Sequence, residues 1–299
     1  MQTTPNIAAK TPALVHGADI SQYQGTINWD VFSRKVQYVF IRAVSGVRPD
    51  SMLEFNVREA RRTGLPYGLY YVPVWSADWQ KQAAVHIQVE KALGGPLPPV
   101  MDLERHYSLS PKELSQIVVK WMVLVEKAVN KSMMIYTGPG FYNPRIGDTN
   151  VLWRRKLWVA HWDVPRPTLP DEWRTRGQTW SIWQYSADKN EKASDYGVPP
   201  PPEADPDLDL NHFNGDAAAF EAAFGVKPKP FPVEPPPGAP LGIVRTARET
   251  RLFTMPIDKP ENQAGILHPN YEFEIIGEEQ NGFVPVKAYL PKSRLTKVS

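Results

Sequence analysis

Along most of the chain, segments with the apolar pattern of β-strands alternate with segments with the apolar pattern of α-helices. Short runs rich in β-branched and aromatic residues have the composition of buried strands, and between them apolar residues recur at the spacing of a helix face. The longest helical segment is Lys112–Asn130, where Leu114, Val118, Trp121 and Val125 form one apolar stripe. The pattern predicts strands at Ala13–Ile20, Tyr38–Val44, Tyr67–Val72, Pro99–Leu103, Met133–Tyr136, Lys156–Ala160, Trp180–Tyr185 and Leu208–Leu210, and helices at Trp29–Arg34, Met52–Thr63, Trp79–Leu93 and Lys112–Asn130.

The order strand, helix, strand favours right-handed crossovers between parallel strands. Eight such strands predict an α/β fold in the form of a modified TIM-like (β/α) barrel, with fewer helices in the last third because helical patterns thin out after Tyr136. An open doubly wound sheet is the alternative architecture. We expect a turn-rich loop at Gly138–Gly147 and a surface loop or insertion at the proline-rich Pro199–Asp207.

Proline marks a boundary between two domains. The chain has 31 prolines, and KPKPFPVEPPPGAP (Lys227–Pro240) has the composition of a semi-rigid polyproline II spacer. All 10 tryptophans precede this segment. We therefore predict a large domain at residues 14–225, a linker at 226–240 and a small all-β barrel at 241–299. Its predicted strands are Gly242–Ala247, Thr250–Thr254, Tyr271–Gly277 and Phe283–Ala288.

Composition and charge exclude several classes of function. The 34 Lys and Arg balance the 32 Asp and Glu at a formal net charge of +2, so the basic excess of a nucleic-acid-binding protein is missing. There is no Cys, and the 6 His show no paired ligand spacing, so no metal is expected. The sequence has no phosphate or dinucleotide motif and no G-x-S-x-G elbow, and we expect no cofactor. Apolar runs are too short for membrane insertion, and the first residues predict no signal peptide.

Four acidic residues fall at the strand ends that would meet at the mouth of a barrel. Asp19 ends the first predicted strand, Asp102 and Glu104 end the fourth, and Asp209 lies on the last. Because Asp102 and Glu104 are two residues apart, both would face the same side of a strand. Like charges in a partly dry cleft raise the pKa of one carboxyl, which can then act as a general acid near neutral pH. Paired carboxylates of this kind are typical of glycosidases, and the backbone spacing fits both retention and inversion.

Each acid also has a purely structural interpretation. Asp19 with Ser21 fits an Asx-type turn, and the DLE segment fits a strand end with solvated charges. Asp209 fits a cap for the helix expected near Asp216. We favour the functional interpretation because the four acids converge on one end of separately predicted strands.

Aromatic residues follow the same strand ends, where their flat faces would suit sugar rings. Trp121 and Trp158 are instead predicted to pack between the barrel and its helices. The other candidates for a carbohydrate groove are Trp75, Trp79, Tyr136, Trp162, Trp183 and Tyr185.

Eight segments of the large domain occur in the order ADISQYQGTINW, YVFIRAVSG, GLPYGLYY, PVMDLE, MIYTGPGFY, LWVAHW, WSIWQYS and LDLNHFNG. Together they resemble glycoside hydrolase family 25, the Chalaropsis-type lysozymes, over Leu14–Phe224. The resemblance implies a modified (β/α) barrel and hydrolysis of the β-1,4 bond between N-acetylmuramic acid and N-acetylglucosamine in bacterial peptidoglycan. Glu104 would be the general acid, and Asp102 would orient or polarise the substrate N-acetyl group, which would assist retention. Asp19 and Asp209 would shape the site electrostatically and hydrogen-bond the sugar.

The resemblance also implies which residues line the groove. The positions that match the family are Tyr70, Tyr136, Trp162 and Gln184. The chain departs from the family pattern at Pro199–Asp207, where the family has a shorter glycine-containing turn before its Asp-Leu-Asn strand. We therefore expect the edge of the groove to differ from that of the family.

The C-terminal run ILHPNYEFEIIGEEQNGFVPVKA resembles bacterial SH3-like domains, which implies binding of wall peptide or glycan. Alternatively, its phenylalanines only fill a core and the domain docks on the barrel. A barrel, a proline spacer and a wall-binding module are arranged as in a phage or prophage endolysin. Such a protein is expected to be a monomer that stays in the host cytoplasm until lysis and then reaches the cell wall.

Two other functions are compatible with parts of this pattern. A non-catalytic glycan-binding or virion structural protein could keep the same barrel, although the complete set of four acids favours an enzyme. A chitinase would be expected to carry a longer Asp-rich motif than PVMDLE. The muramidase is therefore the favoured function.

Overall fold

The computed structural model describes residues 14–187, 193–201, 203 and 207–232, together with the backbone of five short strands farther along the chain. The chain divides into two units, Met1–Phe231 and Pro232–Ser299. The exact domain and linker boundaries expected from the sequence stay predictions, because much of the second unit lies outside the described residues.

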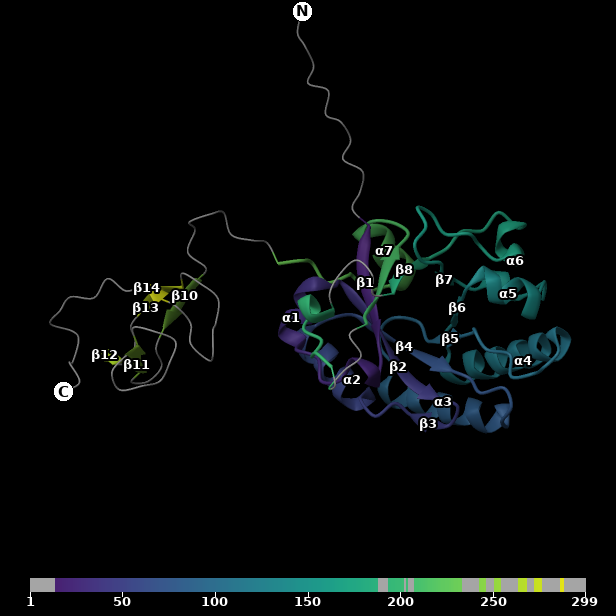
Figure 1. The fold of residues 1–299 in the computed structure, drawn as a ribbon, viewed down its shortest axis with the longest axis horizontal. Helices are drawn as coiled ribbons and strands as arrows, with labels where there is room; N and C mark the ends of the chain where they lie inside the picture. Colours follow the sequence, from purple (N-terminus) through teal and green to yellow (C-terminus); the bar gives the residue numbers. More distant parts are fainter. Residues whose placement is uncertain are drawn as a thin grey trace, which may run out of the picture. The chain divides into compact units, whose positions relative to one another are not determined.

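The first unit is built on a sheet that closes on itself (Figure 1). Strand β1 (Val15–Ile20) pairs with β2 (Tyr38–Ser45) on one side and with β9 (Asp209–Phe213) on the other. This closure confirms the predicted barrel and excludes the open doubly wound sheet. A two-residue strand, β3 (Arg48–Pro49), extends the sheet beside β2. The remaining barrel strands, in order from β2 round to β9, are β4 (Tyr67–Val72), β5 (Val100–Asp102), β6 (Met134–Thr137), β7 (Leu157–Ala160) and β8 (Ile182–Ala187).

The last strand departs from the expected right-handed crossovers. Strand β9 pairs antiparallel with both β1 and β8, whereas the other barrel pairings are parallel. A parallel return needs a long crossover, normally helical, and the described part of the β8–β9 connection contains only the 3₁₀ turn η3 (Ala193–Tyr196). The chain therefore enters β9 at the barrel end where the parallel strands finish, which brings Asp209, the first residue of β9, to that end.

Helices pack around the outside of the barrel (Figure 1). Ser110 and Glu113 form a capping box at the start of α4 (Pro111–Val129), and Asn130 ends this helix in the left-handed conformation. The prediction of a loop at Gly138–Gly147 is wrong, because Pro139 starts the short helix α5 (Pro139–Arg145), which is anchored by the fully buried Tyr142. The helices are α1 (Trp29–Lys35), α2 (Leu53–Thr63), α3 (Trp79–Leu93), α4 (Pro111–Val129), α5 (Pro139–Arg145), α6 (Asp171–Arg174) and α7 (Ala217–Phe224), with 3₁₀ turns η1 (Gln22–Gln24) and η2 (Leu152–Arg154).

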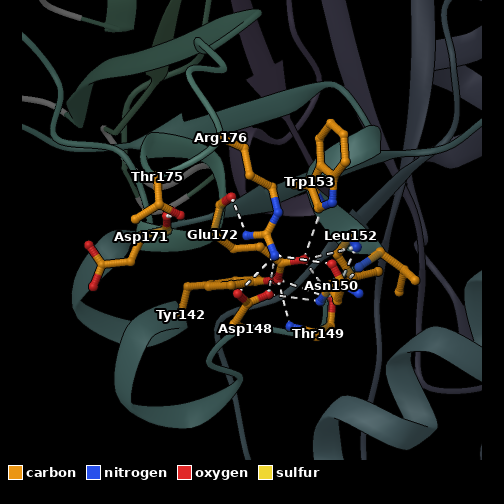
Figure 2. Close-up of polar contacts among 11 residues, drawn as sticks. Tyr142, Asp148, Thr149, Asn150, Leu152, Trp153, Asp171, Glu172, Thr175 and Arg176 are labelled. Carbon is orange, nitrogen blue, oxygen red and sulfur yellow. Dashed lines mark hydrogen bonds and ion pairs between the residues drawn. The ribbon is translucent and has the colours of Figure 1, made fainter.

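A buried carboxylate links the irregular segments that follow β6 and β7 (Figure 2). Glu172 on α6 accepts hydrogen bonds from the Tyr142 hydroxyl, from the backbone N–H and hydroxyl of Thr149 and from the Leu152 N–H. Its residue is only 2% exposed, so these bonds replace the water that a carboxylate would otherwise require. This cluster compensates for the shortage of regular helices in the second half of the barrel.

The described part of the second unit consists of five short strands in two small antiparallel sheets. Four of them fall within predicted strands, and β12 was not predicted. The SH3-like barrel depends on residues outside the described strands and stays a prediction. The strands are β10 (Gly242–Arg245), β11 (Thr250–Phe253), β12 (Gln263–Leu267), β13 (Glu272–Ile275) and β14 (Val286–Lys287). In the described residues, no helix has the length and apolar character to cross a membrane.

Candidate active site

A cleft of about 390 Å³ opens at the end of the barrel where the parallel strands finish. All eight residues selected from the sequence line it, so the structure brings the four acids and the four groove residues together. These are Asp19, Tyr70, Asp102, Glu104, Tyr136, Trp162, Gln184 and Asp209. Sequence reasoning did not select the other lining residues, which are Ser21, Tyr23, Gln24, Arg42, Ser45, Val72, Arg105, Trp158 and Asp207.

Asp19 and Asp209 form a carboxyl pair on one wall of the cleft. They are directly opposite each other in the antiparallel β1–β9 pairing, so their side chains point to the same face. Their carboxyl groups share a hydrogen bond, and Oδ2 of Asp19 also accepts from Asn211 Nδ2 at 2.7 Å and from Gln184 Nε2 at 3.0 Å. One proton held between the two carboxyls removes the repulsion of two adjacent negative charges.

Burial controls the protonation of this pair. Desolvation raises the pKa of Asp19 to about 7, although the hydrogen bonds from Asn211 and Gln184 act in the opposite direction. Desolvation and the charge of Asp19 raise the pKa of Asp209 to about 8. Because the two carboxyls share a hydrogen bond, the charge of one affects the protonation of the other. At neutral pH the pair retains at least part of its protons.

Asp102 and Glu104 form a second pair at the end of β5. Asp102 is the last residue of the strand and is 8% exposed, and its Oδ1 is buried with no hydrogen-bond partner among the described residues. Glu104 lies two residues farther on, with a side chain that is 40% exposed to the cleft. Desolvation raises the pKa of both carboxyls; the charge of Glu104 raises that of Asp102 further, and Arg105 acts against both shifts. The geometry therefore places a protonatable, accessible carboxyl beside a buried one.

Gln184 connects three of the other site residues. Its Oε1 accepts from the Tyr136 hydroxyl at 2.9 Å and from Trp162 Nε1 at 3.0 Å, while its Nε2 donates to Asp19. Gln184 is 1% exposed, so its amide is fixed by these bonds. Because the residue lies on β8, the rigid barrel holds an aromatic rim and an acid in one network.

Trp162 presents the most exposed tryptophan surface of the cleft, since 47% of the residue is accessible. Trp121 is fully buried on α4, in the packing role expected of it. The role expected of Trp158 between barrel and helices is wrong, because its ring contacts Tyr70 and Tyr136 of other barrel strands and is part of the cleft lining. The proposed groove positions at Trp75, Trp79, Trp183 and Tyr185 are wrong, because these rings are absent from the described lining of the cleft. They pack against the main hydrophobic core instead.

Two arginines add positive charge to this acidic cleft. Arg42 on β2 is paired with the buried Asp50, and Arg105 lies 3.8 Å from Glu104, measured from Nε to Oε1. The sequence contained a signal for Arg42, because YVFIRAVSG is otherwise an apolar strand and a lone arginine within it requires a partner. Asp207 lies at the end of the proline-rich segment and contributes to the lining, so this departure from the family pattern reaches the cleft.

The donor set does not form a metal centre. In the part of the chain with defined positions, no group of three or more His, Asp or Glu side chains is arranged to hold an ion. The arrangement instead provides general acid chemistry, a proton-sharing carboxyl pair and an exposed aromatic face.

Comparisons with known proteins agree with this geometry. The sequence model described as "Glycosyl hydrolases family 25" matches residues 18–193. The uncharacterized protein YegX of Escherichia coli is 30% identical over 237 residues, which are 75% of this chain and 80% of that protein. Lysozyme M1 of Streptomyces globisporus is 29% identical over 223 residues, or 70% of each chain. The crystal structure of a bacterial lysozyme from Streptomyces coelicolor aligns with a TM-score of 0.59 and 27% identity, covering 71% of this chain and 97% of that one.

The family match covers more than half of the chain, from within β1 to beyond β8, and it includes Asp19, Asp102 and Glu104, three of the four acids. The barrel closure and the acidic cleft at its mouth are consistent with that match. The chain is therefore a lysozyme-like glycoside hydrolase and belongs to glycosyl hydrolases family 25.

Proposed function

We propose that this chain is a muramidase that hydrolyses the β-1,4 bond between N-acetylmuramic acid and N-acetylglucosamine in peptidoglycan, with Glu104 as the general acid. The observation that carries the proposal is the Asp102–Glu104 pair. Burial raises the pKa of Glu104, and its carboxyl is still accessible to a sugar in the cleft. A proton donor must meet both conditions to protonate a leaving glycosidic oxygen near neutral pH.

The other residues support a reaction assisted by the substrate. Glu104 donates its proton to the glycosidic oxygen as the bond from that oxygen to the anomeric carbon breaks. The acetamido oxygen of the N-acetylmuramic acid that carries this anomeric carbon attacks it. Asp102 accepts a hydrogen bond from the acetamido N–H and stabilises the positive charge that develops on the acetamido group. Water then adds to the anomeric carbon, Glu104 takes up the proton of that water, and the acetamido group is restored with retention. Asp19 and Asp209 hydrogen-bond the sugar from the opposite wall.

Product analysis tests the bond and the acid. Purified peptidoglycan is digested with the wild-type chain and with Glu104→Gln, reduced with borohydride and examined by mass spectrometry. We expect reduced N-acetylmuramic acid ends from the wild type and a rate about 10²–10⁴ lower in the variant, whose fold and glycan binding are retained because the change is isosteric. New N-acetylglucosamine ends would indicate a glucosaminidase, and no products on any wall would indicate a non-catalytic glycan-binding or virion structural protein.

A second substrate tests the participation of the acetamido group. Glycan that lacks the muramyl N-acetyl group cannot supply the attacking oxygen, so it should be cut far more slowly than acetylated glycan of the same length. Equal rates on both would contradict assistance by the substrate. In that case a protein carboxylate would have to act as nucleophile or base.

We also propose that the enzyme acts as an endolysin whose C-terminal unit binds wall peptide or glycan. Support comes from the proline-rich segment at residues 226–240 and from the short antiparallel strands that follow it. Expression of the full chain inside a bacterium should leave the cells intact until the membrane is permeabilised, and lysis should then be rapid. Glu104→Gln is the control, and lysis by that variant would contradict the proposal.

A further inference from the structure

Arg42 is a cationic residue of the cleft to which the proposed mechanism assigns no role. It lies on β2 opposite Tyr70 of β4, and both residues line the cleft together with Asp102. The Arg42 side chain is 13% exposed, so most of it is removed from solvent while part of it faces the cleft. An arginine in this position either stabilises the fold or binds an anion that enters the site.

A buried carboxylate fixes the direction of the guanidinium. Arg42 donates from Nε to Oδ2 of Asp50 at 2.7 Å, and the Asp50 side chain is 1% exposed. Asp50 is itself held by the backbone, because Oδ2 accepts from the Gln22 N–H and Oδ1 accepts from the Met52 N–H. The contact therefore uses Nε of the guanidinium and leaves its two terminal nitrogens to bind a ligand.

Tyr23 covers one face of the same group. The Arg42 Cζ lies 4.6 Å from the centre of the Tyr23 ring, a cation–π distance, and 56% of Tyr23 is exposed. Neither terminal nitrogen of Arg42 has a hydrogen-bond acceptor among the residues with defined positions. Two parallel N–H donors on a fixed planar group match the two oxygens of a carboxylate.

The described lining of the cleft is mostly acidic, so an anion that enters it would be attracted by the cationic side chains alone. The described lining contains two cationic side chains, Arg42 and Arg105, and Arg42 is the more buried of the two. Asp19, on the strand β1 that pairs with β2, shares a hydrogen bond with Asp209, and the pair keeps part of its protons at neutral pH. Repulsion between this pair and an anionic substrate group is correspondingly reduced.

We propose that Arg42 binds a carboxylate carried by the muramyl residue and that it is a specificity-determining residue, selecting muramyl glycan over polymers of N-acetylglucosamine alone. This inference rests on the proposed function, because the two sugars differ by the lactyl ether of muramic acid. That ether ends in a free carboxylate in strands without peptide. In intact wall it is amide-linked to a peptide, which brings carboxylates of its own.

Matched substrates test the inference. The measurement is kcat/KM on soluble glycan of alternating N-acetylglucosamine and N-acetylmuramic acid, with the lactyl group as free carboxylate, as carboxamide, or linked to a stem peptide whose carboxylates are free or amidated. The wild type should prefer a charged form over its neutral counterpart by about tenfold, the strength of one charge-assisted pair. A preference for the free lactyl carboxylate over the lactyl carboxamide identifies the lactyl carboxylate as the ligand. A preference for the stem peptide with free carboxylates over the amidated peptide identifies a peptide carboxylate.

Arg42→Gln should abolish this preference, measured as the ratio of kcat/KM on the charged and the neutral substrate. Arg48→Gln is the matched control, because Arg48 is an exposed arginine on the adjacent strand β3 and does not line the cleft. An equal preference in Arg42→Gln and wild type would overturn the inference and leave Arg42 as a structural partner of Asp50. No preference in the wild type would overturn it too.

A second variant covers the case in which Arg42→Gln fails to fold around the buried Asp50. Arg42→Lys keeps a positive charge beside Asp50 but loses the two parallel donors, so the preference should fall at least threefold, by about the loss of one of two hydrogen bonds. An unchanged preference in this variant would overturn the inference. A wild-type protein that cuts none of these substrates would instead refute the proposed function. This outcome differs from a failure of the inference, in which the wild type cuts the substrates but shows no preference that depends on Arg42.

Discussion

Asp19 and Asp209 are direct partners in the antiparallel pairing of β1 and β9, and their carboxyl groups share a hydrogen bond at the seam where the barrel closes. The seam therefore contains an acid pair whose pKa values are raised to about 7 and about 8, mainly by burial. A pair of this kind links fold stability to pH, since the folded chain binds protons that the unfolded chain has already released.

The first prediction is that Asp19→Asn stabilises the protein at alkaline pH. Both carboxyls have folded pKa values above the unfolded value of 3.8, so their contribution to stability is complete below about pH 4 and is lost as the pH rises through 7 and 8. The free energy of unfolding falls by about 1.4 kcal/mol per pH unit for each proton that the folded chain binds and the unfolded chain does not. An asparagine can accept the hydrogen bonds from Asn211 and Gln184 without carrying a charge.

Urea denaturation at pH 5 and pH 8 measures this effect. The free energy of unfolding of Asp19→Asn minus that of wild type should be larger at pH 8 than at pH 5. A constant difference at the two pH values would show that Asp19 has an ordinary pKa in the folded protein. Activity should fall in the variant at both pH values, because the proposed role of Asp19 in sugar binding is weakened.

The second prediction concerns the pH dependence of hydrolysis. Burial raises the pKa of Glu104, and Arg105 opposes this shift through its positive charge. The rate should therefore fall as the pH rises and Glu104 loses its proton. Arg105→Gln should move this alkaline limb to higher pH, and Arg105→Lys should leave it near the wild-type position.

Salt provides an internal check on that prediction. Arg105 is 57% exposed, so its effect on Glu104 should shrink at high ionic strength, and the wild-type limb should approach that of Arg105→Gln. Profiles of kcat/KM at low and high salt measure both shifts. An alkaline limb that is identical in all three proteins would mean that another group supplies the proton.

The third prediction assigns the exposed face of Trp162 to substrate binding. Its ring is 47% exposed and its Nε1 donates to Gln184, so the indole is held with one face open to the cleft. Trp162→Ala should raise KM about tenfold and change kcat less than about threefold, since stacking on a sugar is present in both the ground state and the transition state. Trp162→Phe keeps an aromatic face and should show a smaller rise in KM. A fall in kcat alone would place Trp162 in the chemistry instead.

The periodicity of the sequence was sufficient to predict the barrel and most of its strands. Each parallel strand from β1 to β8 is an apolar run with turn residues at its ends, and the capped helices α1 to α4 follow their amphipathic patterns. Periodicity carries no information on strand direction, so it predicted a strand at Leu208–Leu210 but not that β9 runs antiparallel to its neighbours. The position of Asp209 at the mouth was right only because β9 enters the barrel at the end where the other strands leave it.

The sequence was sufficient to predict which acids line the cleft. It was not sufficient to predict contacts between cleft residues that are distant in the sequence. Asp102 and Glu104 are neighbours in sequence, so their proximity could be inferred directly. The contact between Arg42 and Tyr23 depends on how the β1–α1 segment folds over β2, and no local pattern reports it. Helix α5 was mistaken for a loop because the burial of Tyr142 against Trp173 and Glu172 outweighs the turn preference of its glycines and prolines.

The fourth prediction is that the Glu172 cluster in Figure 2 stabilises the second half of the barrel. Glu172→Gln replaces one carboxylate oxygen by an N–H₂ group, which would face the Thr149 N–H in one orientation and the Leu152 N–H in the other. Leaving buried donors without acceptors should lower the free energy of unfolding by about 2–4 kcal/mol. Asp171→Asn is the matched control on the same helix: its ion pair with Arg174 is more than half exposed, so the change should be below about 0.5 kcal/mol.

Thermal and urea denaturation of both variants measure this difference. Since Glu172 does not line the cleft, kcat/KM of the folded Glu172→Gln protein at low temperature should stay close to that of wild type. Equal stabilities of Glu172→Gln and Asp171→Asn would mean that the buried carboxylate is not needed to hold the segments after β6 and β7. A loss of activity without a loss of stability would instead mean that this cluster affects the cleft through Trp173. The Nε1 of Trp173 donates to the carbonyl of Arg155, which lies just before β7.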